Sequence, residues 1–285
     1  MIHLSYDLHF ARNYLRAETL PSPFCSGCGC GTLMNCFLKA MEEMGHRDLK
    51  EFVFCSGIGC SSWIPSPHFK ADTIHVTHGR SIPVALGVKL ARPDLKLVVF
   101  GGDGDLAGIG LNHFIQAARR NLDVTVIMVN NMIYGMTGGQ VAPTTPLGVR
   151  TSTTPFGSFE YPIDACKLAV ASGAPYAARW TTFHVIQLKE AIKEGLNREG
   201  FSFVEVIAQC PTIFGRRLGM GDARKMLHWF RENSIHISKA KDMDGGLLEG
   251  KIVVGEFANL EKPGLLRNIN ELRKKVIQAE QTQPH

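Results

Sequence analysis

The sequence predicts an α/β protein in which a mostly parallel sheet is covered by helices on both faces. Short apolar runs alternate with segments of helical periodicity along most of the chain, which is typical of parallel strands joined by helical crossovers. The clearest unit lies at residues 97–140, where a strand, a glycine-rich turn, a helix, a second strand and a polar turn follow one another. Both turns leave the same edge of the sheet, where such folds bind ligands.

The predicted elements follow one another from the N-terminus to about residue 207. Residues 1–20 are expected to form an extended arm or a short helix, which Pro21 and Pro23 bring to an end. Apolar and β-branched runs predict strands at residues 51–54, 74–77, 97–100, 124–129 and 203–207. Apolar residues at helical spacing predict helices at residues 32–44, 81–91, 111–120, 163–172 and 184–199.

The composition changes from Phe214 onward, and the chain is expected to have three parts. They are an N-terminal arm (1–22), a domain that carries the chemistry (23–210) and a C-terminal extension (211–285). Within the extension, residues 251–257 are expected to form a strand and residues 268–281 an exposed, charged helix. We expect the extension to wrap over the domain or over a partner.

Composition and charge narrow the function classes. The 285 residues are 45% hydrophobic and 20% charged, which is ample for one large core. No apolar run approaches the length of a membrane span, and the N-terminus lacks the pattern of a secretory signal. The net charge of +5 is not gathered into one run, and no RNA-binding signature is present. We therefore expect a cytoplasmic protein without nucleic-acid or membrane partners.

Two polar turns predict a site for a metal ion and a diphosphate. Asp103 follows one strand of the unit and Asn131 follows the next, so both can reach one point at the sheet edge. A carboxylate and an amide carbonyl are hard oxygen donors that suit Mg²⁺. Gly101, Gly102 and Gly104 let the backbone approach a phosphate closely. The alternative is a turn capped by Asp103 and an unrelated turn at Asn130 and Asn131. Because Asp103 and Asn131 follow consecutive strands of one unit, the metal site is favoured.

The eight cysteines of a chain expected in the cytoplasm are better candidates for metal ligands than for disulfides. Cys25 and Cys28 form a CxxC pair, and Cys60 and Cys210 each follow a predicted strand and could join them. Four thiolates suit either tetrahedral Zn²⁺ or a [4Fe–4S] cluster, and spacing alone leaves both open together with no metal at all. Cys55 is the main rival to Cys60 as a ligand.

The sequence around these turns resembles a known family. GDG followed one crossover later by NN is the thiamine-diphosphate motif, and the fuller string is GGDGDLAGIGLNHFIQAARRN…NNMIYGMTGGQ. It is similar to the β subunit of 2-oxoacid:ferredoxin oxidoreductases, and within that family to the 2-oxoglutarate enzymes. The resemblance runs from about Pro23 to about Pro263. It implies a thiamine-diphosphate-binding fold in the domain at 23–210.

The resemblance also implies roles for particular residues. It places one [4Fe–4S] cluster on Cys25, Cys28, Cys60 and Cys210, whereas Cys30, Cys36, Cys55 and Cys166 match no ligand position. It places Mg²⁺ on Asp103, Asn131 and the backbone carbonyl of Ile133. It implies thiamine-diphosphate contacts at Ile58, Gly59, Cys60, Ser61, His78, Gly104, Asp105, Gly135 and Met136. From the residues alone, a lone histidine such as His78 is more often structural, and Asp105 could equally cap a helix.

The implied activity is the oxidative decarboxylation of 2-oxoglutarate, or the reverse carboxylation. Coenzyme A would accept the succinyl group, and electrons would pass through the cluster to ferredoxin. The resemblance also implies an α subunit that supplies the glutamate activating the cofactor, and small γ and δ subunits are further candidate partners. The alternatives are the same chemistry on pyruvate or a branched-chain 2-oxoacid, a thiamine enzyme without a cluster, and a non-catalytic zinc-binding assembly module.

Two departures from the family bear on the substrate. Trp63 and Gly138 stand where relatives of broad specificity can have a lysine, so a partner subunit could supply the recognition of substrate charge. Arg216 and Arg217 could bind an anionic substrate or coenzyme A, or simply form an exposed basic patch.

Overall fold

The computed structural model describes residues 9–282, which build one eight-stranded sheet. Residues 1–8 of the predicted arm lie outside the described part. The strand order is β2-β1-β3-β4-β6-β5-β8-β7. All neighbouring strands are parallel except β5 and β8, which confirms the prediction of a mostly parallel sheet. The strands are β1 (Phe52–Ser56), β2 (Asp72–His75), β3 (Lys96–Gly102), β4 (Val124–Asn130), β5 (Tyr176–Thr181), β6 (Phe201–Ile207), β7 (Ser234–His236) and β8 (Ile252–Asn259).

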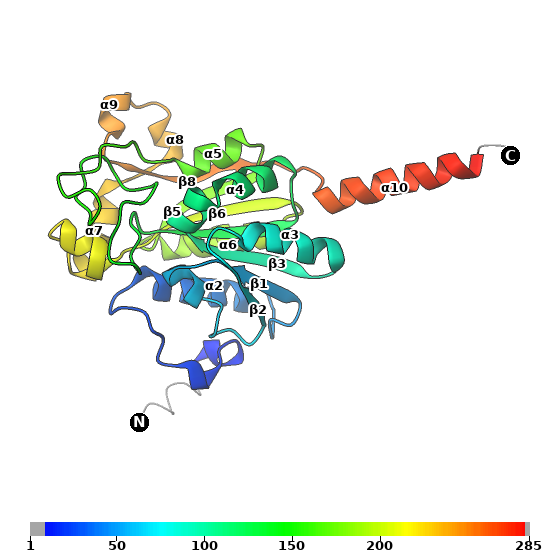
Figure 1. Cartoon of the computed structure of the whole chain (residues 1–285), viewed down its shortest axis with the longest axis horizontal. Helices are drawn as coiled ribbons and strands as arrows, with labels where there is room; N and C mark the ends of the chain where they lie inside the picture. The colour runs from blue at the N-terminus through cyan, green and yellow to red at the C-terminus, as the bar shows by residue number, and fades with distance from the viewer. Residues whose placement is uncertain (1–8, 283–285) are drawn as a thin grey trace.

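Helices cover both faces of the sheet, as predicted (Figure 1). One face packs against α2 (Gly29–Glu43) and α6 (Val185–Asn197). The other packs against α3 (Ser81–Ala91), α4 (Leu111–Arg119) and α5 (Ala165–Ala171). The remaining segments are η1 (Phe10–Asn13), η2 (Ala17–Thr19), η3 (Cys60–Trp63), η4 (Gly104–Ile109), η5 (Pro211–Gly215), α7 (Ala223–Asn233), α8 (Ile237–Ala240), α9 (Gly245–Leu248) and α10 (Leu265–Thr282).

Each sheet face has its own apolar core because successive strand residues point to opposite sides. Phe54 of β1 packs in the α2–α6 core with Phe37, Phe69 and Phe100, whose rings meet edge to face or stacked. Cys55, the next residue along β1, packs in the other core. The two cores hold the central strands in a fixed register, so the turns at their carboxyl ends are held on a rigid base.

The C-terminal extension contributes to the same sheet. The predicted strand at 251–257 is β8, which pairs antiparallel with β5, and β7 was not predicted at all. In Figure 1, α10 (red) projects away from the rest of the molecule. The division at residue 210 stays a prediction. Within residues 9–282, no helix is both long enough and apolar enough to cross a membrane.

The sequence did not predict β5, although β5 is buried along almost its whole length. Its residues are Tyr-Ala-Ala-Arg-Trp-Thr, and two alanines followed by an arginine do not resemble a buried β-branched run. The structure shows why the strand forms nonetheless. Arg179 lies directly opposite Glu205 of β6, and its Nε donates to the Glu205 carboxylate at 2.6 Å. Tertiary pairing of opposite charges therefore overrides the weak local signal.

Candidate functional site

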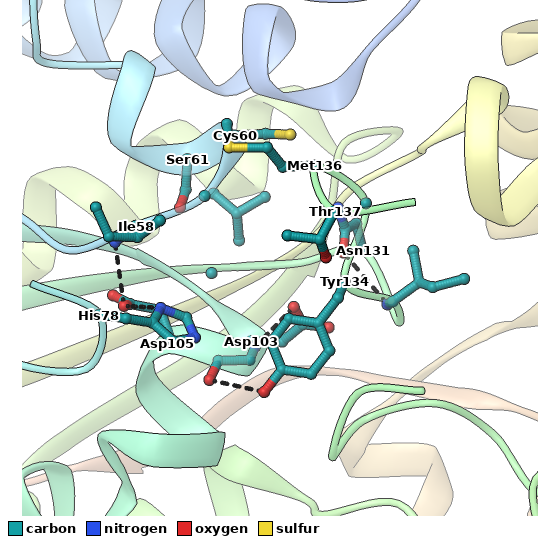
Figure 2. A pocket seen from close by; sticks show the side chains of 16 residues that line it. Ile58, Cys60, Ser61, His78, Asp103, Asp105, Asn131, Tyr134, Met136 and Thr137 are labelled. Atoms are coloured by element: carbon teal, nitrogen blue, oxygen red, sulfur yellow. Dashed lines mark hydrogen bonds and ion pairs between the residues drawn. The ribbon is translucent and has the colours of Figure 1, made fainter. Parts of the chain in front are cut away.

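One cavity lies at the carboxyl ends of the central strands, and every residue that the resemblance assigns to the cofactor or Mg²⁺ lines it, whereas Gly101 does not. Its volume is about 230 Å³. The turns after β1, β2, β3 and β4 supply its walls, as expected for ligand sites at the edge of an α/β sheet. In the view of Figure 2, Cys60 and Met136 lie on one side of the cavity, and Asp103 and Tyr134 lie on the other.

Asp103 follows β3 and is buried at the cavity wall. Its Oδ1 accepts a hydrogen bond from the N–H of Gly104 at 2.9 Å, and its Oδ2 accepts one from the Thr144 hydroxyl at 2.5 Å. Burial raises the pKa of this carboxyl to about 6, although both hydrogen bonds act to lower it. Among the described residues, no cationic side chain pairs with this buried carboxylate, and a bound cation would stabilise it.

Asn131 follows β4, the parallel neighbour of β3, and faces the same cavity. Its Oδ1 accepts a hydrogen bond from the N–H of Ile133 at 3.3 Å. Between them, Met132 adopts a left-handed backbone with φ of 62°, which is unusual for a residue with a side chain. The turn therefore brings an amide oxygen and the backbone of Ile133 to the wall beside Asp103, so the predicted Mg²⁺ ligands share one cavity.

Asp105 joins three of the turns that build the cavity. Its Oδ1 accepts hydrogen bonds from the N–H of Gly79 at 2.7 Å and of Ile58 at 3.3 Å. The Nδ1 of His78 lies 2.8 Å from the same oxygen, outside hydrogen-bond geometry. Burial raises the pKa of Asp105, and the two N–H donors act to lower it. Gly57 leaves the space that this carboxylate needs, since a Cβ there would lie 2.3 Å from both of its oxygens.

Two polar residues of the site were missed by sequence reasoning. The Tyr134 hydroxyl donates to the carbonyl of Gly104 at 3.2 Å, and a Cβ at Gly104 would lie 2.1 Å from the Tyr134 ring. An aromatic residue just after the NN pair could have signalled this packing. Thr144, which donates to Asp103, lies in a long loop with no periodic pattern, so no local signal marks it.

The four cysteines predicted to bind the cluster lie close enough to influence one another's charge. Cys28 is the N-cap of α2, Cys60 begins η3 and Cys210 precedes η5. Burial, and then the negative charge of the other three thiolates, raise the pKa of Cys60 to about 11. Neighbouring thiols that oppose one another's ionisation are stabilised as thiolates when a cationic centre binds them.

This group of thiols borders the cavity. Cys60 lines it, and a Cβ at Gly135 would lie 3.7 Å from the Cys210 Sγ and 3.5 Å from the Asn131 Nδ2. Among the described residues, no three histidine, cysteine or acidic side chains converge tightly enough to hold a single metal ion. A four-iron cluster binds each thiolate through a different iron, so its ligands surround the cluster rather than meet at one point.

The other cysteines lie apart from this group, with one exception. Cys55 is buried in the core on the α3–α5 face, and burial alone raises its pKa to about 12. Cys36 and Cys166 are also buried in the cores. Cys30 is the exception, because its thiol is hydrogen-bonded to Cys28 and thereby lowers the pKa of Cys28.

The residues singled out for substrate charge do not line the cavity. Trp63 is partly exposed at the end of η3. Arg217 donates from Nη2 to the carbonyl of Gly138 at 3.3 Å, so it fastens the glycine turn after Met136. Arg216 follows η5 and is exposed. No carboxylate-binding cluster of basic side chains is formed by the described residues that line the cavity.

Comparisons with known proteins agree with this architecture. A family model for the C-terminal, thiamine-pyrophosphate-binding domain of thiamine pyrophosphate enzymes matches residues 57–206. These residues begin just after β1 and include β2, β3, β4, β5 and almost all of β6, with the turns that build the cavity wall. The matched region therefore coincides with the sheet edge described above.

Similar proteins carry two related names. The chain is 53% identical to "2-oxoglutarate synthase subunit KorB" of Methanocaldococcus jannaschii, over 94% of this chain and 99% of that protein. It is 43% identical to "2-oxoacid:ferredoxin oxidoreductase subunit beta" of Saccharolobus solfataricus, over 66% and 62% of the two chains. A solved structure, 2-oxoglutarate:ferredoxin oxidoreductase of Magnetococcus marinus with 2-oxoglutarate, coenzyme A and succinyl-CoA bound, superposes with a TM-score of 0.81 at 31% identity, covering 98% of this chain and 97% of that one.

Proposed function

We propose a function from one premise: the chain belongs to the thiamine-diphosphate-binding family of 2-oxoacid:ferredoxin oxidoreductase β subunits. With its partner subunits it converts 2-oxoglutarate and coenzyme A to succinyl-CoA and CO₂, or catalyses the reverse carboxylation, and exchanges electrons with ferredoxin. The names of the relatives and the molecules bound in the Magnetococcus marinus structure support this substrate. A cytoplasmic location fits eight thiols that form no disulfide.

The observation that carries the proposal is the convergence of Asp103 and Asn131 on one cavity from adjacent parallel strands. Mg²⁺ accepts few protein ligands and completes its shell with phosphate oxygens and water. The Asp103 carboxylate, the Asn131 amide and the Ile133 carbonyl would hold the ion, and the ion would hold the diphosphate. The buried and otherwise unneutralised charge of Asp103 fits that role.

The turns around the ion would hold the diphosphate end of thiamine diphosphate. When bound, this cofactor supplies a thiazolium ring that stabilises a carbanion. Asp105 fixes the backbone of Ile58 and Gly79, so the walls of the site are preorganised. The Ser61 hydroxyl is buried at the wall without a partner in the described structure and could donate to the cofactor. A cavity of about 230 Å³ is smaller than the roughly 300–1,000 Å³ of complete ligand sites, which suits a site that a partner completes.

Cys25, Cys28, Cys60 and Cys210 would hold the [4Fe–4S] cluster at the wall of the same cavity. Their mutual electrostatic influence supports this set, and the position of Cys55 in the core on the other face of the sheet argues against it as the third ligand in place of Cys60. A cluster there would lie beside the cofactor, so electrons would have a short path out of the site. The thiol of Cys30 is hydrogen-bonded to Cys28. Through this hydrogen bond the protein would tune the reduction potential of the cluster.

Replacement of Asp103 tests the cofactor site. In the assembled enzyme, depleted of thiamine diphosphate and Mg²⁺, Asp103→Ala should abolish Mg²⁺-dependent binding of the cofactor, because the ion loses its only charged protein ligand. Asp94→Ala is the matched control, since Asp94 is exposed and pairs with Arg92 on the surface. Titration calorimetry measures the binding. Unchanged, Mg²⁺-dependent affinity in a folded Asp103→Ala variant would refute the assignment.

A further inference from the structure

A buried charged network lies beneath the cavity, and the cofactor site proposed above does not use it. Glu205 of β6 and Arg179 of β5 are 1% and 8% exposed. The Arg179 Nε donates to Glu205 Oε2 at 2.6 Å, and its Nη2 donates to Asp164 Oδ1 at 2.5 Å. Asp164 in turn caps α5 by accepting from the N–H of Lys167. Such charges are costly to bury, so the location of their partners is informative.

The network reaches the Mg²⁺ turn through one hydrogen bond. The second oxygen of Glu205, Oε1, accepts from the Nδ2 of Asn130 at 2.7 Å. The Oδ1 of the same amide accepts from the N–H of Met132 at 3.0 Å. Asn130 is the last residue of β4 and is itself buried. Its side chain therefore connects the carboxylate of β6 directly to the turn that carries Asn131.

The turn needs such a connection because its backbone is in an unfavourable region. Met132 has a φ of 62°, which a residue with a side chain adopts only when its surroundings hold it there. A second contact, from the Thr145 hydroxyl to the Met132 carbonyl at 2.7 Å, holds the peptide group on the other side of Met132. Asn131 lies between Asn130 and Met132, which these hydrogen bonds hold in place. The direction of its side-chain amide therefore depends on both neighbours.

We propose that Glu205 is a positioning residue for the metal site: it orients the Asn130 amide, which holds the Met132 turn and so presents Asn131 and the Ile133 carbonyl to Mg²⁺. This inference rests on the proposed Mg²⁺ site. Arg179 has the supporting role, because its Nε binds Oε2 of Glu205 and leaves Oε1 facing Asn130 of β4. Residues that orient metal ligands through one hydrogen bond commonly change metal affinity by about 10–100-fold when replaced.

An exchange of the two polar groups gives a sharp test. Asn130→Asp places two carboxylates at hydrogen-bond distance, and Glu205→Gln leaves one amide oxygen for two donors. In the double variant N130D/E205Q, the Gln amide can donate to the new Asp, so the bond between positions 130 and 205 is restored with reversed direction. The bonds from Arg179 and from the N–H of Met132 keep their direction. The net charge of the pair is also restored.

The measurement is the Mg²⁺ dissociation constant of the assembled enzyme at saturating thiamine diphosphate, with the melting temperature recorded alongside. Each single variant should bind Mg²⁺ about tenfold or more weakly. The double variant should return to within about threefold of the parent, because the two changes are strongly coupled. Asp164→Asn is the matched control: it removes the other carboxylate of Arg179, and it should lower the melting temperature without changing Mg²⁺ affinity.

The outcomes separate this inference from the proposed function. If the parent enzyme binds thiamine diphosphate without any need for Mg²⁺, the proposed site fails. If the parent depends on Mg²⁺ but the double variant is as weak as the singles, or the folded singles bind like the parent, the positioning role fails. Should a single variant not fold, the double variant still decides. If Asn130 and Glu205 stabilise the fold independently, the double variant should be at least as unstable as the single variants. If they act through their shared hydrogen bond, the double variant should fold and bind Mg²⁺.

Discussion

At the scale of single residues, Asp103 combines two opposing influences on one carboxyl group. Burial favours its neutral form, whereas the Thr144 hydroxyl and the N–H of Gly104 favour its charged form. Burial prevails, and the pKa in the metal-free chain rises from 3.8 to about 6. Folding therefore favours the protonated form, and this contribution to stability is lost as the pH rises through about 6. Mg²⁺ binding has the opposite dependence, because the ion needs the carboxylate.

The first prediction here concerns pH. Mg²⁺ affinity should be level above pH 6 and should fall by up to about tenfold per pH unit below it, because a proton must then leave Asp103. Thr144→Val removes the hydroxyl that favours the charged form, so it should move the midpoint of this fall to higher pH. Calorimetric titrations of Mg²⁺ between pH 5 and 8 on both proteins measure the shift. The cofactor phosphates titrate in the same way with both proteins, so the difference between the two curves reports on Asp103. A midpoint that stays the same in Thr144→Val would contradict the account.

A second prediction concerns the thiols. Cys60→Ser should lose iron, because Cys60 belongs to the group of four thiols at the cavity. Cys55→Ser should keep the full iron content, because Cys55 is enclosed in the core on the other face of the sheet. Iron and sulfide per chain, measured after anaerobic purification, distinguish the two. Loss of iron in Cys55→Ser together with retention in Cys60→Ser would show that the third ligand was misassigned.

At the scale of elements, the glycine turns determine the shape of the cavity. Gly104 begins η4 just after Asp103, and the ring of Tyr134 occupies the space where its side chain would be. The same tyrosine donates to the Gly104 carbonyl and so joins the turn after β3 to the turn after β4. The two halves of the predicted Mg²⁺ site thus depend on one close packing contact.

Replacement of Gly104 tests this contact. Gly104→Ala should push Tyr134 out of place, since the added Cβ would lie 2.1 Å from its ring, and should weaken cofactor binding at least about tenfold. Gly87→Ala is the control: it lies within α3 with nothing within 4 Å of its added Cβ, and it should be neutral or stabilising by up to about 1 kcal/mol. Cofactor affinity and melting temperature are measured for both. Equal cofactor affinity in the two variants would show that the contact does not shape the site.

Sequence reasoning could predict the elements whose signals are local. The strand–turn–helix–strand unit and the mostly parallel sheet follow from apolar runs and turn residues next to each other in the chain. The other residues of the cavity wall were indicated by the family resemblance, whose motifs lie in the same turns. What it missed depends on distant partners. β5 forms around the pairing of Arg179 with Glu205, and Thr144 reaches Asp103 from a loop without periodicity. Neither contact leaves a pattern within one segment.

At the scale of the whole molecule, the site is open and incomplete. Ile58 and Met136 line the cavity yet are 43% and 48% exposed, so an apolar rim surrounds its mouth. Asp103 and Asp105 are the acidic residues among the described residues that line the cavity, and both are engaged in fixing its walls. Activation of thiamine diphosphate requires a further carboxylate within hydrogen-bond reach of its other ring. We therefore expect the partner subunit to cover this rim and to supply that acid.

The most direct test of the central claim is the turnover of this chain alone. The full chain, reconstituted with iron, sulfide, Mg²⁺ and thiamine diphosphate, is assayed for reduction of an electron-accepting dye that depends on 2-oxoglutarate and coenzyme A. The account predicts no steady turnover until the partner subunits are added, and turnover at the rate of the native assembly afterwards. Steady turnover by the chain alone, near the rate of that assembly, would contradict it, because the activating acid would then lie within these 285 residues.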